Sequence, residues 1–271
     1  MRFVKGHGTE NDFVLLPDGA DGLDAETVRT LCDRRRGIGA DGVLAVVRVA
    51  APTEADPRWF MDYRNADGGV AEMCGNGIRV FARYLVDSGL EEPGDLLVGT
   101  RAGVKTVTVP AAGDITVGMG RAERLPDAKV QLGERWWAAS GWSMGNPHLV
   151  VADPDLDIDT ADLSVTPAVD PPAAYPDGVN VELVDATAAA ATKASIRMRV
   201  HERGVGETRS CGTGACAAAV AVMAARGERA SYGVDVPGGR LTVTWRDDGE
   251  VLLSGPAVLT YRGEYPNDTP R

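Results

Sequence analysis

A short cysteine motif occurs twice in this 271-residue chain, half a chain length apart. The first copy, Gly69 to Gly77, reads GVAEMCGNG, and the second, Gly206 to Gly214, reads GETRSCGTG. An apolar stretch typical of a helix follows each copy. The fold must therefore place two equivalent thiols in two equivalent settings.

The segments around the motifs repeat as well. A hairpin is predicted after each helix, at 104–119 in the first half and at 241–254 in the second. An Asn ahead of an apolar pair also recurs, as Asn11 and Asn146. This repetition indicates an internal duplication and so two similar domains, each near the common domain size.

We expect an N-terminal half-domain at 1–118 that carries Cys74 and is joined by the C-terminal tail at about 258–271. The second half-domain is expected at 119–257 and carries Cys211. Short segments of alternating polarity are typical of β-strands, and few helices are predicted beside them. The predicted fold class is α/β in the mixed, α+β sense, with two pseudo-symmetric domains.

Composition excludes several classes of protein. The chain is 44% hydrophobic and 25% charged, and no apolar run is long enough to cross a bilayer. Charged residues interrupt Met1 to Leu16, so no secretory signal is expected and a cytoplasmic protein with reduced thiols is predicted. A net charge of -11 argues against nucleic acid or an anionic membrane as partner. With three His and no clustered ligands, no metal site is expected.

The position of the cysteines suits acid/base chemistry. Glycines after a thiol permit a tight turn into a helix, whose positive end is expected to lower the thiol pKa. The exposed amides at Gly75-Asn76 and Gly212-Thr213 could bind a carboxylate whose α-carbon loses a proton. Two thiols on opposite sides of that carbon would support racemisation or epimerisation without a cofactor.

Free cysteines are also often small buried residues with no chemical role. Here the thiol recurs while its neighbours differ, Met73 in one copy and Ser210 in the other, which favours a catalytic role. Cys32 and Cys216 have no counterpart in the other half, and we interpret both as structural.

Six ordered motifs extend over nearly the whole chain. They are KGHGTENDF from Lys5, RNADG from Arg64, MCGNG from Met73, GNPH from Gly145, DGVNVE from Asp177 and ERGVGETRSCGTG from Glu202. In all six the chain resembles the diaminopimelate epimerase family. The resemblance implies two domains, each a β-barrel-like sheet around a central helix, with the active site in the cleft between them. It also implies a homodimer without a cofactor that converts LL-diaminopimelate to meso-diaminopimelate, in lysine and peptidoglycan precursor biosynthesis.

The same resemblance implies roles for individual residues. Cys74 and Cys211 match the two catalytic acid/bases, and His148 and Glu202 match the polar pair that supports catalysis. The positions that match substrate-binding residues are Asn11, Asn65, Gly75, Asn76, Asn146, Asn180, Glu202, Arg203, Gly212 and Thr213. Amides that donate and accept, with an Arg that can clamp a carboxylate, suit a substrate with two amino acid ends.

One position departs from the family, since Gly42 stands where some members carry a Gln. Three alternatives stay open. The first is another two-thiol racemase, for example for proline or hydroxyproline, although the distal residues such as Asn65 and Arg203 argue against a one-headed substrate. The second is a non-racemising isomerase, which usually lacks the paired cysteines. The third is a redox or binding protein in which Cys74 and Cys211 form a switchable disulfide.

Overall fold

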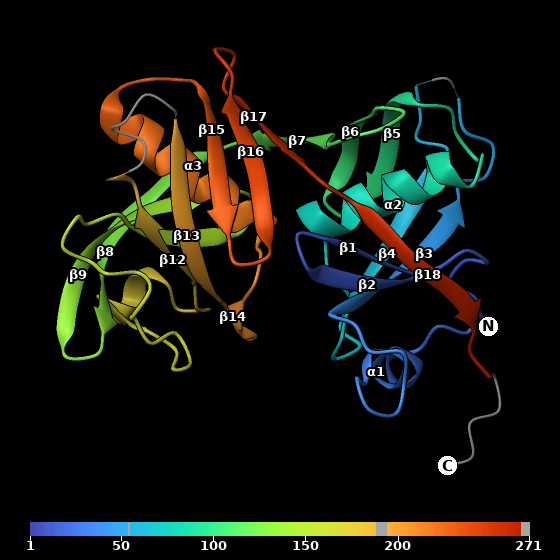
Figure 1. Cartoon of the computed structure of the whole chain (residues 1–271), viewed down its shortest axis with the longest axis horizontal. Coiled ribbons are helices and arrows are strands. Elements are labelled where there is room, and N and C mark those ends of the chain that lie inside the picture. Colours follow the sequence, from blue (N-terminus) through green and yellow to red (C-terminus); the bar gives the residue numbers. More distant parts are fainter. Residues whose placement is uncertain (54, 188–193, 267–271) are drawn as a thin grey trace. The chain divides into compact units, whose positions relative to one another are not determined.

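A computed structural model of the chain describes residues 1–53, 55–187 and 194–266 (Figure 1). Two compact units are present: Met1–Val117 with the segment that begins at Gly255, and Gly118–Ser254. The last part of the predicted tail, 267–271, lies outside the described residues. Strands dominate both units and each contains one long helix, so the predicted mixed α+β class is confirmed.

The first unit is one mixed sheet with two helices. Its strands are β1 (Arg2–Gly8), β2 (Asn11–Leu16), β3 (Gly42–Arg48), β4 (Trp59–Asn65), β5 (Gly94–Thr100), β6 (Gly103–Val109), β7 (Ile115–Arg121) and β18 (Val258–Glu264). They pair in the order β18-β1-β2-β3-β4-β5-β6-β7. Only β2/β3 and β4/β5 are parallel, and the helices α1 (Ala25–Cys32) and α2 (Gly75–Asp87) make these two crossovers.

The second unit has the same sheet. Its main strands are β8 (Glu123–Leu132), β9 (Arg135–Ser143), β10 (Pro147–Val151), β12 (Asn180–Asp185), β13 (Ser195–Glu202), β15 (Ser231–Val236), β16 (Gly239–Trp245) and β17 (Glu250–Gly255). They pair in the order β8-β9-β10-β12-β13-β15-β16-β17, and only β10/β12 and β13/β15 are parallel. The order of parallel and antiparallel pairs is therefore identical in the two units.

Smaller elements complete the second unit. The short strands β11 (Ala168–Asp170) and β14 (Gly206–Thr208) pair with β8 and β13, and a 3₁₀ turn, η1, spans Pro172–Ala174. The helix α3 (Gly212–Arg226) makes the β13/β15 crossover and so corresponds to α2. The predicted hairpins are confirmed as β6/β7 and β16/β17.

The two long helices lie inside their sheets (Figure 1). Helix α2 contacts β1, β2, β3, β4, β6 and β18, and α3 contacts the corresponding β9, β10, β12, β13 and β16 as well as β15. Because strands from both ends of the order touch α2, the first sheet curls around it. Helix α3 is rich in Ala and buried on all sides, as expected of a helix enclosed by a sheet.

Local sequence explains where these helices begin and end. Each starts directly after a cysteine, Cys74 for α2 and Cys211 for α3, which occupies the N-cap position. Helix α3 ends at Gly227, whose φ of 69° is in the left-handed region that glycine adopts without strain. Gly89, with φ of 71°, follows the end of α2 in the same way.

A further hydrophobic core lies on the outer face of each sheet. In the first unit α1 covers β2 and β3 through Val28, Leu31 and the buried Cys32. In the second unit, Ile158 and Leu163 come from the connection between β10 and β12 and cover the outer sheet face. No described helix is long and apolar enough to span a membrane.

The first unit is completed by the end of the chain. Strand β18 pairs with β1 along nearly its whole length and contacts α2. The corresponding strand of the second unit, β8, instead precedes its neighbour β9 directly. Strand β7 is therefore followed by β8, which pairs with β9, and β17 is followed in the same way by β18, which pairs with β1.

A buried cation links α2 to the segment that enters β18. The Arg79 guanidinium is fully buried and donates to Asn76 Oδ1 (2.9 Å), to the Gly75 carbonyl (3.0 Å) and to the Pro256 carbonyl (3.3 Å). The N-terminal turn of α2 and the last strand of the chain thus share one donor group.

Arg79→Met is expected to lower the free energy of unfolding by about 2–4 kcal/mol, because two buried acceptors and the partly buried Pro256 carbonyl lose a donor. Urea unfolding followed by circular dichroism measures the change. Arg35→Met, at an exposed position, is the matched control and should stay within about 0.5 kcal/mol of wild type. Equal stability of the two variants would contradict this role of Arg79.

Candidate active site

The first unit gathers four of the predicted site residues around the start of α2. The Cys74 sulfur accepts the Gly77 amide at 3.4 Å and lies 3.6 Å from Asn11 Oδ1. The same Asn11 oxygen accepts from Asn76 Nδ2 at 3.2 Å. Its amide nitrogen donates to Asp41 Oδ2 at 2.8 Å. Asn11 thus holds the cysteine and the first turn of the helix together.

The second unit repeats this arrangement at α3. The Cys211 sulfur accepts the Gly214 amide at 3.4 Å and lies 3.5 Å from the Thr213 hydroxyl. In both helices the sulfur accepts the amide of the third helical residue. The two residues before it are Gly75-Asn76 in one helix and Gly212-Thr213 in the other, for which carboxylate binding is a prediction.

The inward faces behind the two cysteines differ. A Cβ added at Gly77 would lie 3.3 Å from Leu44 Cδ2 and 3.4 Å from Phe13 Cζ. A Cβ added at Gly214 would lie only 2.7 Å from Glu182 Oε1. An apolar pair therefore lies behind Cys74, whereas a carboxylate lies behind Cys211.

The polar network of the second unit includes three predicted site residues. His148 Nδ1 lies 2.7 Å from Glu182 Oε1, and both side chains are fully buried. His148 Nε2 lies 3.0 Å from Asn146 Oδ1. Glu202 is hydrogen-bonded to the Thr208 hydroxyl. The structure therefore brings Asn146, His148 and Glu202 into the same unit as Cys211.

The electrostatics of Cys211 oppose the expectation from its helix. Burial raises the pKa of the thiol well above its usual value, and the charges of Glu202 and Glu182 raise it further. The Thr213 hydroxyl and the Gly214 amide lower the pKa, but by less. The predicted lowering of this pKa by the helix is therefore wrong, because desolvation and two carboxylates outweigh the helix terminus.

Burial also raises the pKa of Glu202. The hydrogen bond from Thr208 acts in the opposite direction, the charge of Glu182 raises the pKa, and the Cys211 thiol lowers it. Glu202 and Cys211 therefore interact, and both hold their protons more tightly than they would in water.

The remaining predicted residues occupy loop ends of their units. Asn65 is exposed at the end of β4, opposite Gly42. A Cβ at Gly42 would lie 2.6 Å from the Arg64 carbonyl, so a Gln there would require the strands to shift. The buried Asn180 donates to the Pro147 carbonyl at 2.9 Å and accepts the Arg203 amide at 2.9 Å.

Arg203 itself is exposed, with its guanidinium 3.4 Å from the Asp177 carbonyl. Asn180 thus fixes the backbone of the loop that presents this cation.

Two residues of these networks were missed by the sequence analysis, Glu182 and Arg79. Glu182 had a detectable signal, since it follows Asn180 at a spacing of two in a strand whose other residues up to Val184 are apolar, which places both on the same face. Arg79 had none, because an Arg in an amphipathic helix is ordinarily exposed.

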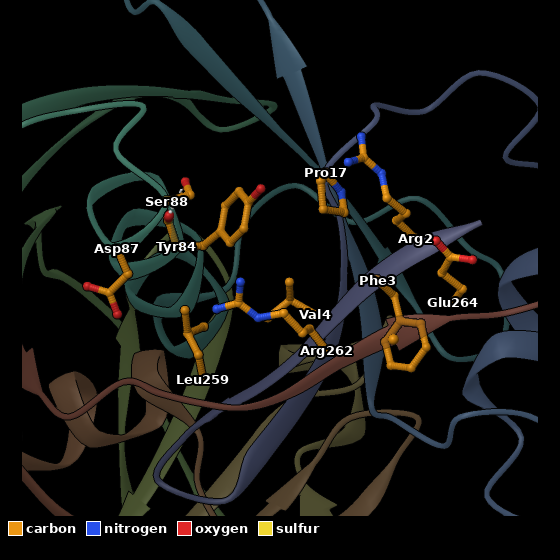
Figure 2. Close-up of a pocket in the computed structure, with 11 residues that line it drawn as sticks. Arg2, Phe3, Val4, Pro17, Tyr84, Asp87, Ser88, Leu259, Arg262 and Glu264 are labelled. Atoms are coloured by element: carbon orange, nitrogen blue, oxygen red, sulfur yellow. Dashed lines mark hydrogen bonds between the residues drawn. The ribbon is translucent and has the colours of Figure 1, made fainter.

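A hollow of about 350 Å³ lies elsewhere in the first unit (Figure 2). Side chains from β1, the end of α2 and β18 line it, with Tyr84 and Arg262 pointing into it. Within the described part of the chain, none of its lining residues is a predicted site residue. No group of three His, Cys, Asp or Glu that could hold a metal ion is found among the described residues.

The sequence that carries the two cysteine-capped helices matches a known protein family. The family model described as Diaminopimelate epimerase matches residues 3–125 and 142–260. The chain belongs to the diaminopimelate epimerase family. A diaminopimelate epimerase from Streptomyces coelicolor is 56% identical, covering 98% of this chain and 95% of the relative. Another, from Mycolicibacterium paratuberculosis, is 49% identical, covering 97% and 96%.

Solved structures share the fold of this diaminopimelate epimerase family member at much lower identity. A probable proline racemase from Agrobacterium radiobacter matches with a TM-score of 0.70 and 17% identity, covering 98% of this chain and 93% of that one. A hydroxyproline epimerase from Agrobacterium vitis matches with a TM-score of 0.71 and 16% identity, covering 100% and 93%. The fold predicted from the internal repeat is therefore that of known racemases and epimerases.

The close approach of Glu182 gives the first prediction for this site. Gly214→Ala is expected to destabilise the protein by about 1–3 kcal/mol, because the added methyl group meets the Glu182 carboxylate. Gly77→Ala, at the equivalent position of α2, meets only contacts of 3.3 Å and more and should cost less. Thermal unfolding of both variants measures the difference, and a larger loss for Gly77→Ala would contradict the geometry.

The raised pKa of Glu202 gives a second prediction. The folded protein binds this proton more tightly than the unfolded chain, so the associated stability is present below the ordinary Glu pKa and is lost as pH rises through the folded value. Glu202→Gln cannot ionise, so its melting temperature should fall less than that of wild type between pH 5 and pH 8. Glu134→Gln, in an exposed turn, is the control and should follow wild type. Parallel curves for wild type and Glu202→Gln would rule out this linkage.

Proposed function

We propose that this protein is a diaminopimelate epimerase, which inverts one α-carbon of LL-diaminopimelate to give the meso isomer. The observation that carries the proposal is the recurrence of one device, a cysteine that caps a buried helix, in two units of identical strand order. A stereoinversion needs one group to remove a proton and another to deliver a proton to the opposite face.

The two cysteines are the proposed acid/base pair. One sulfur, as a thiolate, takes the α-proton and becomes a thiol, and the electron pair stays on the α-carbon. The other sulfur, as a thiol, gives its proton to the opposite face and becomes a thiolate. Proton and charge balance over the step, and the reverse reaction restores the starting state. Cys74 and Cys211 require no cofactor for this chemistry.

The helix termini are proposed to stabilise the intermediate. Negative charge that develops on the α-carbon is shared with the adjacent carboxylate, which gains by facing preorganised donors. The amides of Gly75-Asn76 and Gly212-Thr213 are such donors, and the positive ends of α2 and α3 add to their effect. Their glycines leave these amides unshielded by side chains.

The polar side chains are proposed to hold the two ends of the substrate. His148 and Glu202 support binding of the amino group at the reacting end and the ionisation of the cysteines. Arg203, exposed on its loop, is suited to clamp the distal carboxylate. The amides Asn11, Asn65, Asn146 and Asn180 supply the donors and acceptors for the remaining groups.

The biological setting is part of the proposal. The family resemblance supports a cytoplasmic homodimer that acts in lysine and peptidoglycan precursor biosynthesis without a cofactor. The reacting centre is proposed to lie between the two half-domains, since each contributes one of the two thiols.

Wild-type enzyme in deuterium oxide is expected to convert LL-diaminopimelate to the meso isomer with deuterium at the inverted α-carbon. Cys74→Ala and Cys211→Ala should each reduce the rate of this conversion by about 10²–10⁴-fold, the usual contribution of a general acid or base. Proton NMR of the α-position measures exchange, and a chiral separation measures the isomers.

Cys32→Ala is the matched control, since this buried cysteine is the last residue of α1 and its replacement should leave turnover unchanged. Exchange with proline but not with diaminopimelate would support the acid/base mechanism and contradict diaminopimelate as the substrate. No exchange with any amino acid would contradict the proposal that this protein is an epimerase.

A further inference from the structure

The second unit holds a buried pair of side chains for which the first unit has no charged equivalent. In β10/β12, His148 lies opposite Asn180 and Val150 lies opposite Glu182. The corresponding strands β2 and β3 place Phe13 opposite Gly42 and Leu15 opposite Leu44. By this register, His148 corresponds to Phe13 and Glu182 to Leu44.

All four of these inward-facing side chains are fully buried. The duplicated backbone thus accepts a Phe–Leu pair in one unit and a His–Glu pair in the other. Apolar packing alone satisfies this part of the fold, and replacement of a buried ion pair by apolar residues is often neutral or stabilising. A fully buried His–Glu pair is therefore present for a reason other than stability.

The hydrogen-bond geometry defines the charge of this pair. His148 Nδ1 faces Glu182 Oε1 at 2.7 Å, and His148 Nε2 faces Asn146 Oδ1 at 3.0 Å. Both ring nitrogens face oxygen atoms, and Glu182 Oε2 has no hydrogen-bond partner among the described residues. A proton on each ring nitrogen gives both of these oxygens a donor. The ring then carries two protons and compensates the buried carboxylate.

This charge state determines which end of the Asn146 amide is presented to the substrate. When Nε2 carries a proton it donates to Asn146 Oδ1, which leaves the amide nitrogen as a donor. When Nε2 has no proton it needs a donor, so the amide must turn and present its oxygen instead. A substrate carboxylate is bound by the first arrangement and repelled by the second.

From this geometry we propose that Glu182 is a positioning residue of the epimerase, which keeps His148 doubly protonated and thereby orients the Asn146 amide towards a substrate carboxylate. The inference deepens the proposed function and rests on it. The titratable groups that face the pair are Cys211, on the other side of Gly214, and Glu202 of β13. Both are acidic, so the imidazolium is the one cation of the network made by these four side chains.

The test is a ¹⁵N NMR spectrum of the histidine side chains in the substrate-free, full-length protein at neutral pH. The chain has three histidines, so the His148 signals are identifiable by their loss in a His148 variant. Wild type should show two protonated ring nitrogens for His148. Glu182→Gln, which keeps the shape and removes the charge, should show one. Glu134→Gln is the control and should leave the His148 spectrum as in wild type.

Turnover of LL-diaminopimelate by the same samples gives the second measurement. Glu182→Gln is expected to lose about 10–100-fold in kcat/KM, as is usual for residues that orient a functional group. The loss should be mainly in KM, because the misdirected Asn146 amide weakens carboxylate binding. A neutral His148 in wild type, or a doubly protonated His148 in Glu182→Gln, would overturn the inference. Wild type that fails to turn over diaminopimelate would instead overturn the proposed function.

A double variant tests the pair when Glu182→Gln does not fold. His148→Phe with Glu182→Leu transfers the Phe13–Leu44 pair of the first unit into the second. It should melt at or above the wild-type temperature and lose more than 100-fold in kcat/KM, whereas Glu182→Leu alone should melt lower than both. Turnover within tenfold of wild type in the double variant would show that the pair has no part in the reaction.

Discussion

The position of both thiols depends on one weak hydrogen bond, which each cysteine sulfur accepts from the third amide of a buried helix. It occurs in both units at 3.4 Å. The cap fixes the sulfur at the end of the helix axis, and the sheet that curls around the helix fixes the axis itself. The position of each thiol is thus set by the packing of an entire unit. A flexible loop could not hold two acid/base groups so reproducibly.

The two units share the same backbone arrangement but differ in the side chains that face inward. Strand order and direction are the same in both units, yet Phe13 and Leu44 in one are replaced by His148 and Glu182 in the other. The first unit carries buried charges elsewhere, and the most deeply buried of them is Arg79 of α2. The two thiols therefore sit in unlike surroundings: two carboxylates raise the pKa of Cys211, whereas Cys74 interacts with the Asn11 side chain and the Gly77 amide.

Much of the fold could be predicted from the sequence, because a pattern that recurs in both halves supports the same prediction for each half. The repeated cysteine motif and the hairpins after it indicated two similar domains, each with a helix after its cysteine, and the family resemblance implied that this helix is central. The predicted pKa of Cys211 was wrong because the helix terminus is visible in a motif, whereas Glu182 and Glu202 come from strands distant in sequence. Arg79 was not predicted for the same reason, since its acceptor at Pro256 lies at the other end of the chain.

The pairing of β18 with β1 has a consequence for the order in which the protein is made. A ribosome releases the first strand long before the last one, so β1 waits with an open edge until synthesis is almost complete. All strands of the second sheet, from β8 to β17, are by then available and can assemble as a continuous segment. The first sheet thus lacks its edge strand β18 until the strands of both sheets have been translated.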